Sequence, residues 1–263
     1  MSKIYEALEK AKQDRQSQLS SEMTSLVEEV DTEQEDLPVL NTPESPIAEC
    51  FRFLRAQVTR PSVGSPPRSV LVTSALMGEG KTFVACNLAA SISKSLEEYV
   101  LLIDADLRNP SVHKVFGIRS LREGLSTYLG KGQALPSLLK KTNIDKLSIL
   151  PAGNSADIPS ELLSSEKMKA LIHEVKNRYA DRFVIIDGPP LELTAEASVL
   201  ANEVDAVILV VHHGKTPRDA AKRAVEKIRK DKLLGIVYNR YDEQLKLYHR
   251  YGYYSYGQDK GKS

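Results

Sequence analysis

The chain has 263 residues, 41% of them hydrophobic, which is enough for one large α/β domain or two small ones with a real core. Its 36 Lys and Arg residues nearly balance its 35 Asp and Glu residues, so the net charge of +1 gives no reason to expect nucleic acid as a partner. The two cysteines, Cys50 and Cys86, lie far apart, which argues against a disulfide framework or a zinc site. No apolar run has the length of a signal-peptide core or of the roughly 18 residues that cross a bilayer, so we expect a cytoplasmic protein that reaches a membrane only through a partner.

The first 46 residues divide into two predicted segments. Residues 1–15 place Ile4, Leu8 and Ala11 on one helical face among Lys and Glu, which predicts a short amphipathic docking helix. Such a helix is marginal alone and needs a surface to pack on. Residues 16–46 are rich in Ser, Thr, Glu and Asp, so we expect a disordered acidic linker.

Residues 47–239 have the pattern of one α/β domain. A predicted helix from Pro46 to Thr59, ended by prolines, precedes apolar runs that alternate with helical stretches. Most of these runs lack polar alternation, as is typical of strands covered on both faces. We therefore predict a doubly wound, mostly parallel sheet. The predicted strands are 69–74, 99–104, 147–150, 183–187, 206–211 and 233–238.

A phosphate-binding sequence follows the first predicted strand. The segment Ala75–Thr82, Ala-Leu-Met-Gly-Glu-Gly-Lys-Thr, has Walker A spacing and leads into a predicted helix over 82–93. Its glycines let backbone N–H groups approach phosphate oxygens at a helix N-terminus. Lys81 is expected to contact the β- and γ-phosphates of ATP, and Thr82 to bind Mg²⁺. A glycine-rich turn without a ligand is disfavoured by the flanking strand and helix. The predicted nucleotide-binding residues here are Gly78, Glu79, Gly80, Lys81 and Thr82.

Three aspartates stand at or just beyond the ends of predicted strands: Asp104, Asp106 and Asp187. Because the carboxyl ends of parallel strands line one crevice, we expect these side chains to converge on the triphosphate, where a cation offsets their charge. Asp187 has the place of a Walker B ligand for Mg²⁺, and Asp106 that of a second metal ligand. Asp104 is the predicted acceptor of the substrate proton, and Lys81 completes the predicted catalytic set. A single aspartate at a strand end is as often a helix cap, but three beside a phosphate loop favour catalysis.

Together these motifs resemble a known family. The Walker A segment, Asp104-x-Asp106-x-Arg108 and the motif at Asp187 are similar to those of the bacterial tyrosine kinases, or BY-kinases, found in capsule and exopolysaccharide loci. The resemblance covers the chain from about residue 46 to its end and implies a P-loop NTPase fold of the MinD/ParA-like class. Residues 1–11 look like the autokinases encoded beside exosortase-linked exopolysaccharide genes.

Further segments match the family, and a few positions depart from it. The matching segments are Pro159–Leu163, Gly214–Thr216 and Gly235–Asn239. The departures are Met77, Gly188 and Glu196, where the family often has Pro, Thr and Asp; none of them removes a phosphate or metal ligand. The MinD and ParA ATPases carry a signature Lys at the position held here by Leu76, and its absence favours a kinase.

The resemblance also implies how the protein acts and with which partners. It implies autophosphorylation in trans within a ring-like homo-oligomer built through Glu49-x-x-Arg52-x-x-Arg55, and it assigns Asn239 to the adenine base. The implied partners are a membrane chain-length-determinant (Wzz-like) activator and a cognate phosphotyrosine phosphatase. The activator would recruit the kinase to the inner face of the plasma membrane.

Residues 240–263 are predicted to form a flexible tail that carries the acceptor tyrosines. Aliphatic residues almost vanish there, so the tyrosines cannot belong to a core. About twelve extended residues separate Asn239 from Tyr251, a reach of about 40 Å, which lets the tail enter a neighbour's site. A tail that stacks on single-stranded nucleic acid and a merely sticky terminus are the weaker alternatives. The predicted acceptors are Tyr248, Tyr251, Tyr253, Tyr254 and Tyr256.

Two other functions stay open at this stage. A non-kinase ATPase switch that binds a membrane partner is the main alternative, and a phosphotyrosine blot after incubation with Mg·ATP separates it from a kinase. A GTPase is the second, because Asn239-Arg-Tyr-Asp242 has the spacing of a guanine-reading motif. Competition between ATP and GTP for binding tests this reading.

Overall fold

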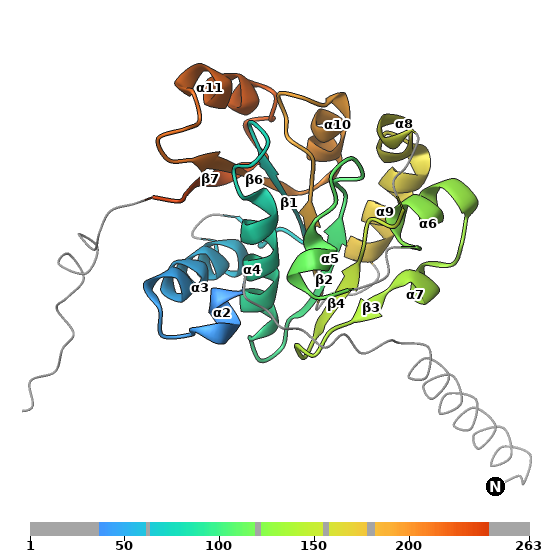
Figure 1. Cartoon of the computed structure of the whole chain (residues 1–263), viewed down its shortest axis with the longest axis horizontal. Coiled ribbons are helices and arrows are strands. Elements are labelled where there is room, and N and C mark those ends of the chain that lie inside the picture. The colour runs from blue at the N-terminus through green and yellow to red at the C-terminus, as the bar shows by residue number, and fades with distance from the viewer. Residues whose placement is uncertain (1–36, 62–63, 119–121, 155–157, 178–181, 242–263) are drawn as a thin grey trace, which may run out of the picture.

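The computed structural model describes residues 37–61, 64–118, 122–154, 158–177 and 182–241. Within these ranges, seven strands form one sheet in the order β3-β4-β2-β5-β1-β6-β7, and helices cover both of its faces (Figure 1). All neighbouring strands pair in parallel except β3 and β4. The prediction of a doubly wound, mostly parallel sheet is therefore confirmed. The predicted docking helix, most of the predicted linker and the tyrosine cluster lie outside the described residues.

The strands agree closely with the apolar runs of the sequence. The central strands β1 and β6 are buried at every position, which explains why they lack polar alternation. The two-residue strand β3 was not predicted, because it is too short to carry a pattern. The strands are β1 (Ser69–Ser74), β2 (Tyr99–Asp104), β3 (Lys140–Lys141), β4 (Leu147–Leu150), β5 (Arg182–Asp187), β6 (Ala206–His212) and β7 (Leu233–Asn239).

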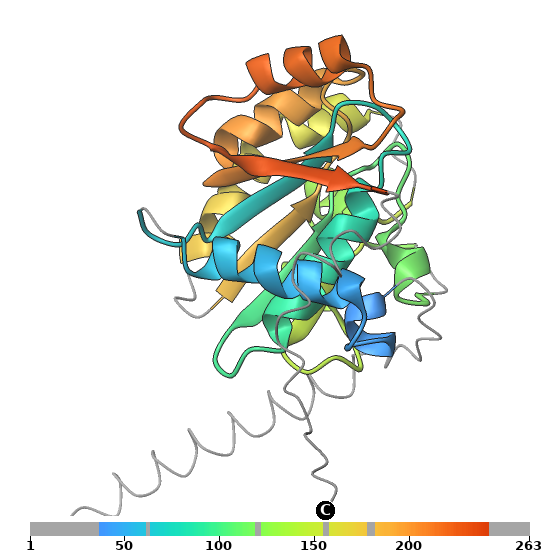
Figure 2. The ribbon, with the colours of Figure 1, turned by 90° about the vertical axis from the view of Figure 1, so that its left-hand side faces the viewer.

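The helices form one layer on each face of the sheet. One core lies between the sheet and α2 to α5, and the other between the sheet and the later helices. Figure 2 shows β7 at an open edge of the sheet, between α3 on one side and α11 on the other. The helices are α2 (Pro38–Asn41), α3 (Pro46–Thr59), α4 (Lys81–Ser93), α5 (Val112–Val115), α6 (Leu125–Lys131), α7 (Leu135–Leu138), α8 (Pro159–Leu163), α9 (Glu166–Asn177), α10 (Ala195–Glu203) and α11 (Arg218–Glu226).

Helix α4 is the central helix of its layer. Its residues Val84–Ser93 are all buried, because α4 packs against β1, β2 and β5 on one side and against α2 and α3 on the other. A helix that is buried on every side needs small or apolar residues all round, and the sequence of α4 supplies them. The helix is therefore held firmly, and so is the segment from which it starts.

The domain begins earlier than the sequence predicted. We expected an acidic linker up to residue 46, but α2 is helical and Leu37 is fully buried in the core beneath α3 and α4. The acidic residues before position 37 dominate the local composition and conceal the short apolar run Leu37–Leu40. The helix predicted from Pro46 to Thr59 is confirmed as α3, which begins where the Ser45 side chain accepts a hydrogen bond from the Ala48 amide.

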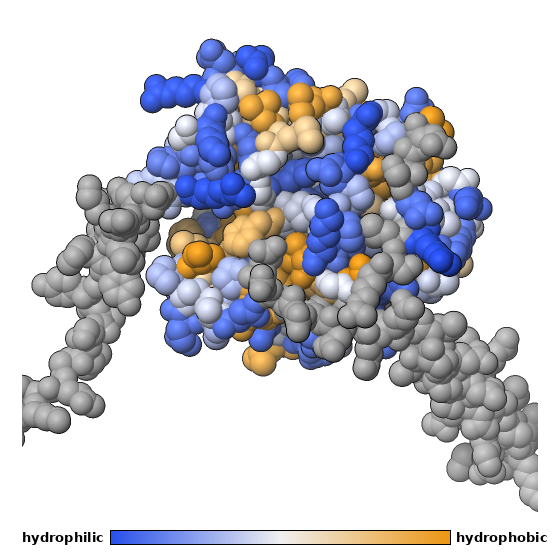
Figure 3. Space-filling model, viewed as in Figure 1, coloured by the Kyte–Doolittle hydropathy of each residue, from blue (hydrophilic) through white to orange (hydrophobic). Residues whose placement is uncertain are grey.

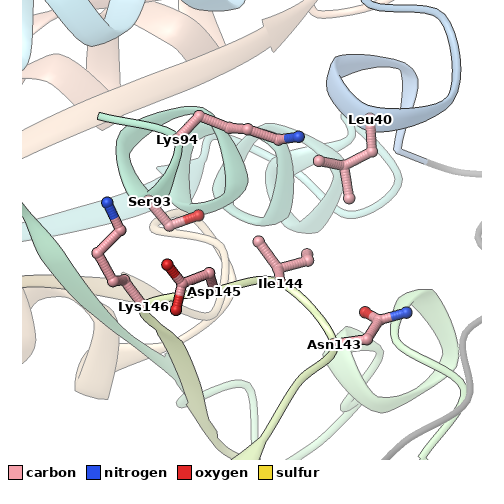
Figure 4. Close-up of a pocket in the computed structure, with 7 residues that line it drawn as sticks. All are labelled: Leu40, Ser93, Lys94, Asn143, Ile144, Asp145 and Lys146. Atoms are coloured by element: carbon pink, nitrogen blue, oxygen red, sulfur yellow. The ribbon is translucent and has the colours of Figure 1, made fainter. Parts of the chain in front are cut away.

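A cavity of about 380 Å³ lies at the C-terminal end of α4, between α2 and the turn that precedes β4 (Figure 4). Lys146 closes one side, where its ammonium group donates to the carbonyl oxygens of Ser95 and Leu96 just beyond α4. Because the predicted phosphate loop lies at the other end of α4, this cavity is not the predicted nucleotide site. Its lining residues are Leu40, Ser93, Lys94, Asn143, Ile144, Asp145 and Lys146.

The face of the described chain that Figure 3 draws carries both polar and apolar side chains. On the face drawn in Figure 3, apolar side chains form small separate patches among polar ones. None of the helices that the structure describes is long and apolar enough to span a bilayer.

Candidate active site

The predicted phosphate loop connects β1 to the N-terminus of α4. Gly78 and Gly80 both have left-handed backbones, with φ of 76° and 89°, a conformation that glycine adopts without steric cost. A Cβ at Gly80 would also lie 2.1 Å from Nδ2 of Asn239, so the Asn239 side chain would have to move away from the loop. The loop thus brings Lys81 and Thr82 to the positive end of the α4 dipole, which favours an anion.

Two contacts bring the predicted catalytic residues together. The Lys81 ammonium lies 2.7 Å from Oδ2 of Asp106, and the Thr82 hydroxyl donates a 2.6 Å hydrogen bond to Oδ2 of Asp187. The Thr82 hydroxyl also lies 2.8 Å from the hydroxyl of Ser111. Because Thr82 has only one hydroxyl hydrogen, Ser111 is then the donor to Thr82. The strand ends therefore meet at the phosphate loop, as the sequence predicted.

Asp104 lies deeper in the site than the other two aspartates and is fully buried. Its carboxylate accepts hydrogen bonds from three backbone amides, those of Ser111 (3.2 Å), Val112 (3.1 Å) and Asp106 (3.3 Å). It also pairs in register with Asp187 on the neighbouring strand. These contacts give Asp104 a structural part, because it shapes the loop that carries Asp106 and Ser111.

The site concentrates negative charge around one ammonium group. Burial raises the pKa of Asp104 well above its ordinary value, and the neighbouring charge of Asp187 adds to the rise. Burial also raises the pKa of Asp187 to about 6, although Lys81 and the hydrogen bond from Thr82 oppose the rise. Burial alone would lower the pKa of Lys81, but Asp187, Asp106 and Asp104 outweigh it and raise the pKa. Such a group of carboxylates favours binding of a further cation.

The residues at Thr82 and Asp187 fit a magnesium ion. Oδ1 of Asp187 is buried and has no hydrogen-bond partner, which leaves one carboxylate oxygen open beside the Thr82 hydroxyl. Among the described residues, no three His, Cys, Asp or Glu side chains are grouped so that they could hold a metal by themselves. Proteins commonly bind Mg²⁺ through one or two carboxylates together with substrate phosphates, so this small donor set is sufficient only with a nucleotide.

Glu79 and Asn239, two predicted nucleotide-binding residues, contact each other across the loop. The Asn239 side chain donates from Nδ2 to the carbonyl oxygen of Glu79 at 2.8 Å. The Glu79 side chain is 3% exposed and accepts a 2.9 Å hydrogen bond from the Leu76 amide. Glu79 would therefore meet a nucleotide through its backbone N–H rather than through its carboxylate.

Comparison with known proteins decides the family. The family model described as "ParA: NUBPL iron-transfer P-loop NTPase" matches residues 67–250. The tyrosine-protein kinase YwqD of Bacillus subtilis (strain 168) is 37% identical over 223 residues, which cover 84% of this chain and 92% of that protein. The chain belongs to the bacterial tyrosine kinases, the BY-kinases. The succinoglycan biosynthesis transport protein ExoP of Rhizobium meliloti (strain 1021) is 32% identical over 232 residues, which cover 82% of this chain but only 29% of that larger protein.

Solved structures agree with both the family and the fold class. The chimerical protein CapA2B2 superposes on this BY-kinase with a TM-score of 0.72 and 30% identity, covering 81% of this chain and 92% of that one. The septum site-determining protein MinD of Pyrococcus horikoshii, complexed with Mg-ADP, has a TM-score of 0.53 and 24% identity, covering 66% and 71% of the two chains. The second likeness shows the fold alone. The prediction of a P-loop NTPase of the MinD/ParA-like class is confirmed.

An ion pair between a half-exposed arginine and a buried glutamate, beside the BY-kinase site, was not predicted. Arg108, two residues beyond Asp106, lies 2.7 Å from Oε1 of Glu196 and donates to the Ser160 hydroxyl at 2.9 Å. The Ser160 hydroxyl donates to Oε2 of Glu196 at 2.9 Å, which closes a triangle. Burial alone would raise the pKa of Glu196, but the hydrogen bonds from Arg108 and Ser160 outweigh it and lower the pKa. The sequence analysis noted the segments of Arg108, Ser160 and Glu196 separately, but no sequence pattern predicts that they contact one another.

The residues predicted to assemble the BY-kinase ring lie on α3. Arg52 is paired within the helix, because its Nε donates to Glu49 at 2.6 Å, and its guanidinium also reaches the carbonyl oxygen of Pro43. Arg55 instead donates to the carbonyl oxygen of Ser91 on α4 at 2.9 Å. The three residues therefore have different local contacts. The predicted acceptor tyrosines lie outside the described residues.

Proposed function

We propose that this BY-kinase is an ATP-dependent protein-tyrosine autokinase, which phosphorylates the tyrosine cluster of its C-terminal tail and thereby regulates exopolysaccharide or capsule polymerisation and export. The observation that carries the proposal is the pair of contacts at the phosphate loop, Lys81 with Asp106 and Thr82 with Asp187. These contacts bring an ammonium group, a hydroxyl and two carboxylates to one helix N-terminus, which supports the proposal. The biosynthetic part rests on the name of the relative ExoP.

The nucleotide would bind with its phosphates in the loop between Gly78 and Thr82. Lys81 would leave Asp106 and contact the β- and γ-phosphates, while backbone N–H groups and the α4 dipole stabilise the negative charge. We infer that ATP is used with Mg²⁺, which Thr82 and Asp187 would hold and which would neutralise charge on the phosphate oxygens. Asn239 is the residue that we assign to the adenine base. Most of the catalysis is then positioning and charge neutralisation.

In the transfer, the bond between the γ-phosphorus and the β–γ bridging oxygen breaks, and a bond from the tyrosine oxygen to that phosphorus forms. The phenolic proton passes to a carboxylate of the site. We propose Asp104 as the acceptor of this proton, and because its two oxygens also accept three backbone hydrogen bonds, Asp106 is the second candidate. When Lys81 turns to the phosphates, Oδ2 of Asp106 becomes free to accept a hydrogen bond. The metal ligands that we propose are Thr82, Asp106 and Asp187.

We propose that the acceptors are Tyr248, Tyr251, Tyr253, Tyr254 and Tyr256 and that transfer occurs in trans within a ring-like homo-oligomer. The described chain reaches Tyr241, two residues after Asn239, whose side chain contacts the phosphate loop. The tail thus starts at the edge of the sheet that carries the site. Glu49, Arg52 and Arg55 would form the contacts between subunits.

The proposed partners follow from the family. They are a Wzz-like membrane activator, which would recruit the cytoplasmic kinase to the inner face of the plasma membrane, and a cognate phosphotyrosine phosphatase. The CapA2B2 chimera, in whose name CapA and CapB are joined, supports a partner of the CapA kind. The balanced charge supports no role for nucleic acid. Residues 1–11, outside the described residues, support a place in the exosortase-linked subgroup.

The test is incubation of the full chain with Mg·ATP, followed by mass spectrometry of phosphotyrosine. Phosphate between residues 248 and 256 supports the proposal, and Lys81→Met should abolish it while leaving the protein folded. ATP hydrolysis without phosphotyrosine would instead identify an ATPase switch. Preference for GTP over ATP in competition binding would instead indicate a GTPase that reads guanine through the motif beginning at Asn239.

Iron transfer, the activity in the description of the matching family model, is not favoured for this chain. Cys86 is buried in α4 whereas Cys50 is exposed on α3, so the two cysteines form no ligand pair.

A further inference from the structure

An acidic side chain lies inside a loop that is built to bind an anion. Glu79 stands between Gly78 and Gly80, in the middle of the phosphate loop. If its carboxylate faced the ligand, it would repel the phosphates. It is instead 3% exposed, because it points into the protein. The loop therefore needs groups that keep this carboxylate turned inward.

Two hydrogen-bond donors hold the Glu79 carboxylate in place. Oε2 accepts from the amide of Leu76 within the loop, and Oε1 accepts from the hydroxyl of Thr216. Thr216 belongs to the loop that follows β6, more than a hundred residues further along the chain. Its hydroxyl oxygen is fixed in turn, because it accepts a 2.8 Å hydrogen bond from the amide of His212 at the end of β6.

A second contact fixes the backbone of the same residue. The Asn239 side chain holds the Glu79 carbonyl oxygen from the end of β7, and the Asn239 carbonyl oxygen accepts from the amide of His213 at 2.9 Å. The ends of β6 and β7 are therefore joined to each other and, through Thr216 and Asn239, to the phosphate loop. Gly78 and Gly80 supply no side chains that could anchor the loop.

We infer that Thr216 is a positioning residue for the phosphate loop and that it acts through Glu79. Its hydroxyl keeps the carboxylate inward, so the backbone N–H groups of the loop stay directed at the site before the nucleotide arrives. A preformed loop does not lose conformational entropy on binding, so it binds more tightly than a loop that must first order. The inference rests only on the nucleotide-binding step of the proposed function and not on transfer to tyrosine.

The test compares variants of the full chain by titration with a fluorescent ADP analogue at fixed Mg²⁺. Thr216→Val keeps the shape but removes the donor to Glu79, so it should weaken binding about tenfold, the scale of one hydrogen bond to a charged group. Thr216→Ser restores the hydroxyl and should bind within about twofold of the parent. Thr127→Val is the control: the Thr127 hydroxyl also accepts a backbone hydrogen bond, from Gly124 at the start of its own helix α6, so the loss of this hydroxyl should leave affinity unchanged.

A double-mutant cycle tests the route through Glu79. Glu79→Ala alone should weaken binding, and adding Thr216→Val to it should then change the affinity less than about twofold, because the two residues act as one unit. If the losses of affinity in the two single variants add up in the double variant, Thr216 does not act through Glu79.

The single variants can also overturn the inference. It fails if Thr216→Val binds the ADP analogue as tightly as the parent, if Thr216→Ser binds as weakly as Thr216→Val, or if Thr127→Val weakens binding as much as Thr216→Val. Should Thr216→Val not fold, Thr216→Ala takes its place with the same expected result. Absent phosphotyrosine would refute the proposed function but leave this inference intact.

Discussion

Gly80 shows how a single residue couples the backbone to the site. It has a left-handed conformation, and a Cβ at this position would lie 2.1 Å from Nδ2 of Asn239, which would then have to shift. The two features have different consequences. The left-handed conformation affects the stability of the fold, whereas the contact with the Asn239 side chain affects the position of a residue that we assign to nucleotide binding.

Gly80→Ala should therefore lower nucleotide affinity by more than its conformational strain explains. The matched variant is Gly132→Ala, because Gly132 is also left-handed, with φ of 73°, and a Cβ there would meet only the flexible end of Lys167 at 3.5 Å. Each should lose about 1–2 kcal/mol of unfolding free energy, the cost of a left-handed alanine. Only Gly80→Ala should weaken binding of the fluorescent ADP analogue, by about tenfold or more. Equal affinities of the two variants would show that Asn239 can move aside.

At the scale of elements, the triangle of Arg108, Glu196 and Ser160 ties the loop after β2 to the starts of α8 and α10. Asp106 lies in that loop, two residues before Arg108. Because Glu196 is almost fully buried, its partners cannot be replaced by water without cost. The triangle therefore limits how far the loop that carries Asp106 can move.

Glu196→Gln should slow phosphotyrosine formation about tenfold at saturating ATP, because an amide cannot accept from both Arg108 and Ser160 as a carboxylate does. Nucleotide affinity should change little, since the phosphate loop is untouched. Glu192→Gln is the control, because Glu192 also pairs with an arginine, Arg223 at 2.6 Å, but outside the site. If both variants transfer phosphate at the parent rate, the triangle has no part in positioning Asp106.

Asp205 anchors the start of β1. Its Oδ2 accepts from the amides of Arg68 and Ser69, both at 3.0 Å, and its Oδ1 lies 2.7 Å from the Lys176 ammonium of α9. Burial alone would raise its pKa, but Lys176 and the amide of Ser69 outweigh it, so the pKa is lowered below the ordinary 3.8. A carboxylate with a lowered folded-state pKa stabilises the fold above its unfolded pKa and loses this contribution as the pH falls.

Asp205→Asn should thus lower the unfolding free energy at pH 7 by about 1–2 kcal/mol. The difference from the parent should shrink as the pH falls below about 4, where the parent carboxylate takes up a proton. Urea unfolding at pH 7, 5 and 3.5 measures this. Asp231→Asn, which removes an exposed pair with Arg229, should leave stability unchanged throughout. If Asp205→Asn loses the same unfolding free energy at every pH, the contribution of Asp205 comes from its shape and not from its charge.

The elements could be predicted because their signals are local. A buried parallel strand shows as an apolar run, and the phosphate loop shows as glycines before a helix, so β1, β2 and the site at Lys81 and Thr82 follow from the sequence. Contacts between distant segments leave no such signal. Two such contacts are those of Glu79 with Thr216 and of Arg108 with Glu196. No pattern in the sequence distinguishes these four residues from other polar residues. Spacing places Asp104 at a strand end, but it cannot show that the Asp104 oxygens also accept three backbone hydrogen bonds.

At the scale of the whole molecule, α3 lies both on the domain and in the proposed contact between subunits. Its inner face is buried through Phe51 and Val58, while the paired Glu49 and Arg52 side chains are exposed to different extents, 68% and 39%. Arg55 belongs to the inner side, because it donates to the carbonyl oxygen of Ser91. The arginines of one motif should therefore have separable effects on assembly and stability.

Arg52→Ala should reduce the mass measured by light scattering while leaving the urea midpoint unchanged, because its contacts within the domain are on the surface. Arg55→Ala should lower the urea midpoint as well, since it leaves the buried carbonyl oxygen of Ser91 without that donor, at a cost of about 1–2 kcal/mol.

The rate of transfer in trans should fall together with the size of the oligomer. The test mixes an active protein truncated after Tyr241 with a Lys81→Met protein that keeps its tail. Phosphate should then appear on the tail of the Lys81→Met protein. Introducing Arg52→Ala into both partners should slow that labelling. Unchanged labelling by dispersed subunits would show that transfer needs only encounters in solution, and an unchanged mass for Arg52→Ala would show that α3 is not the contact.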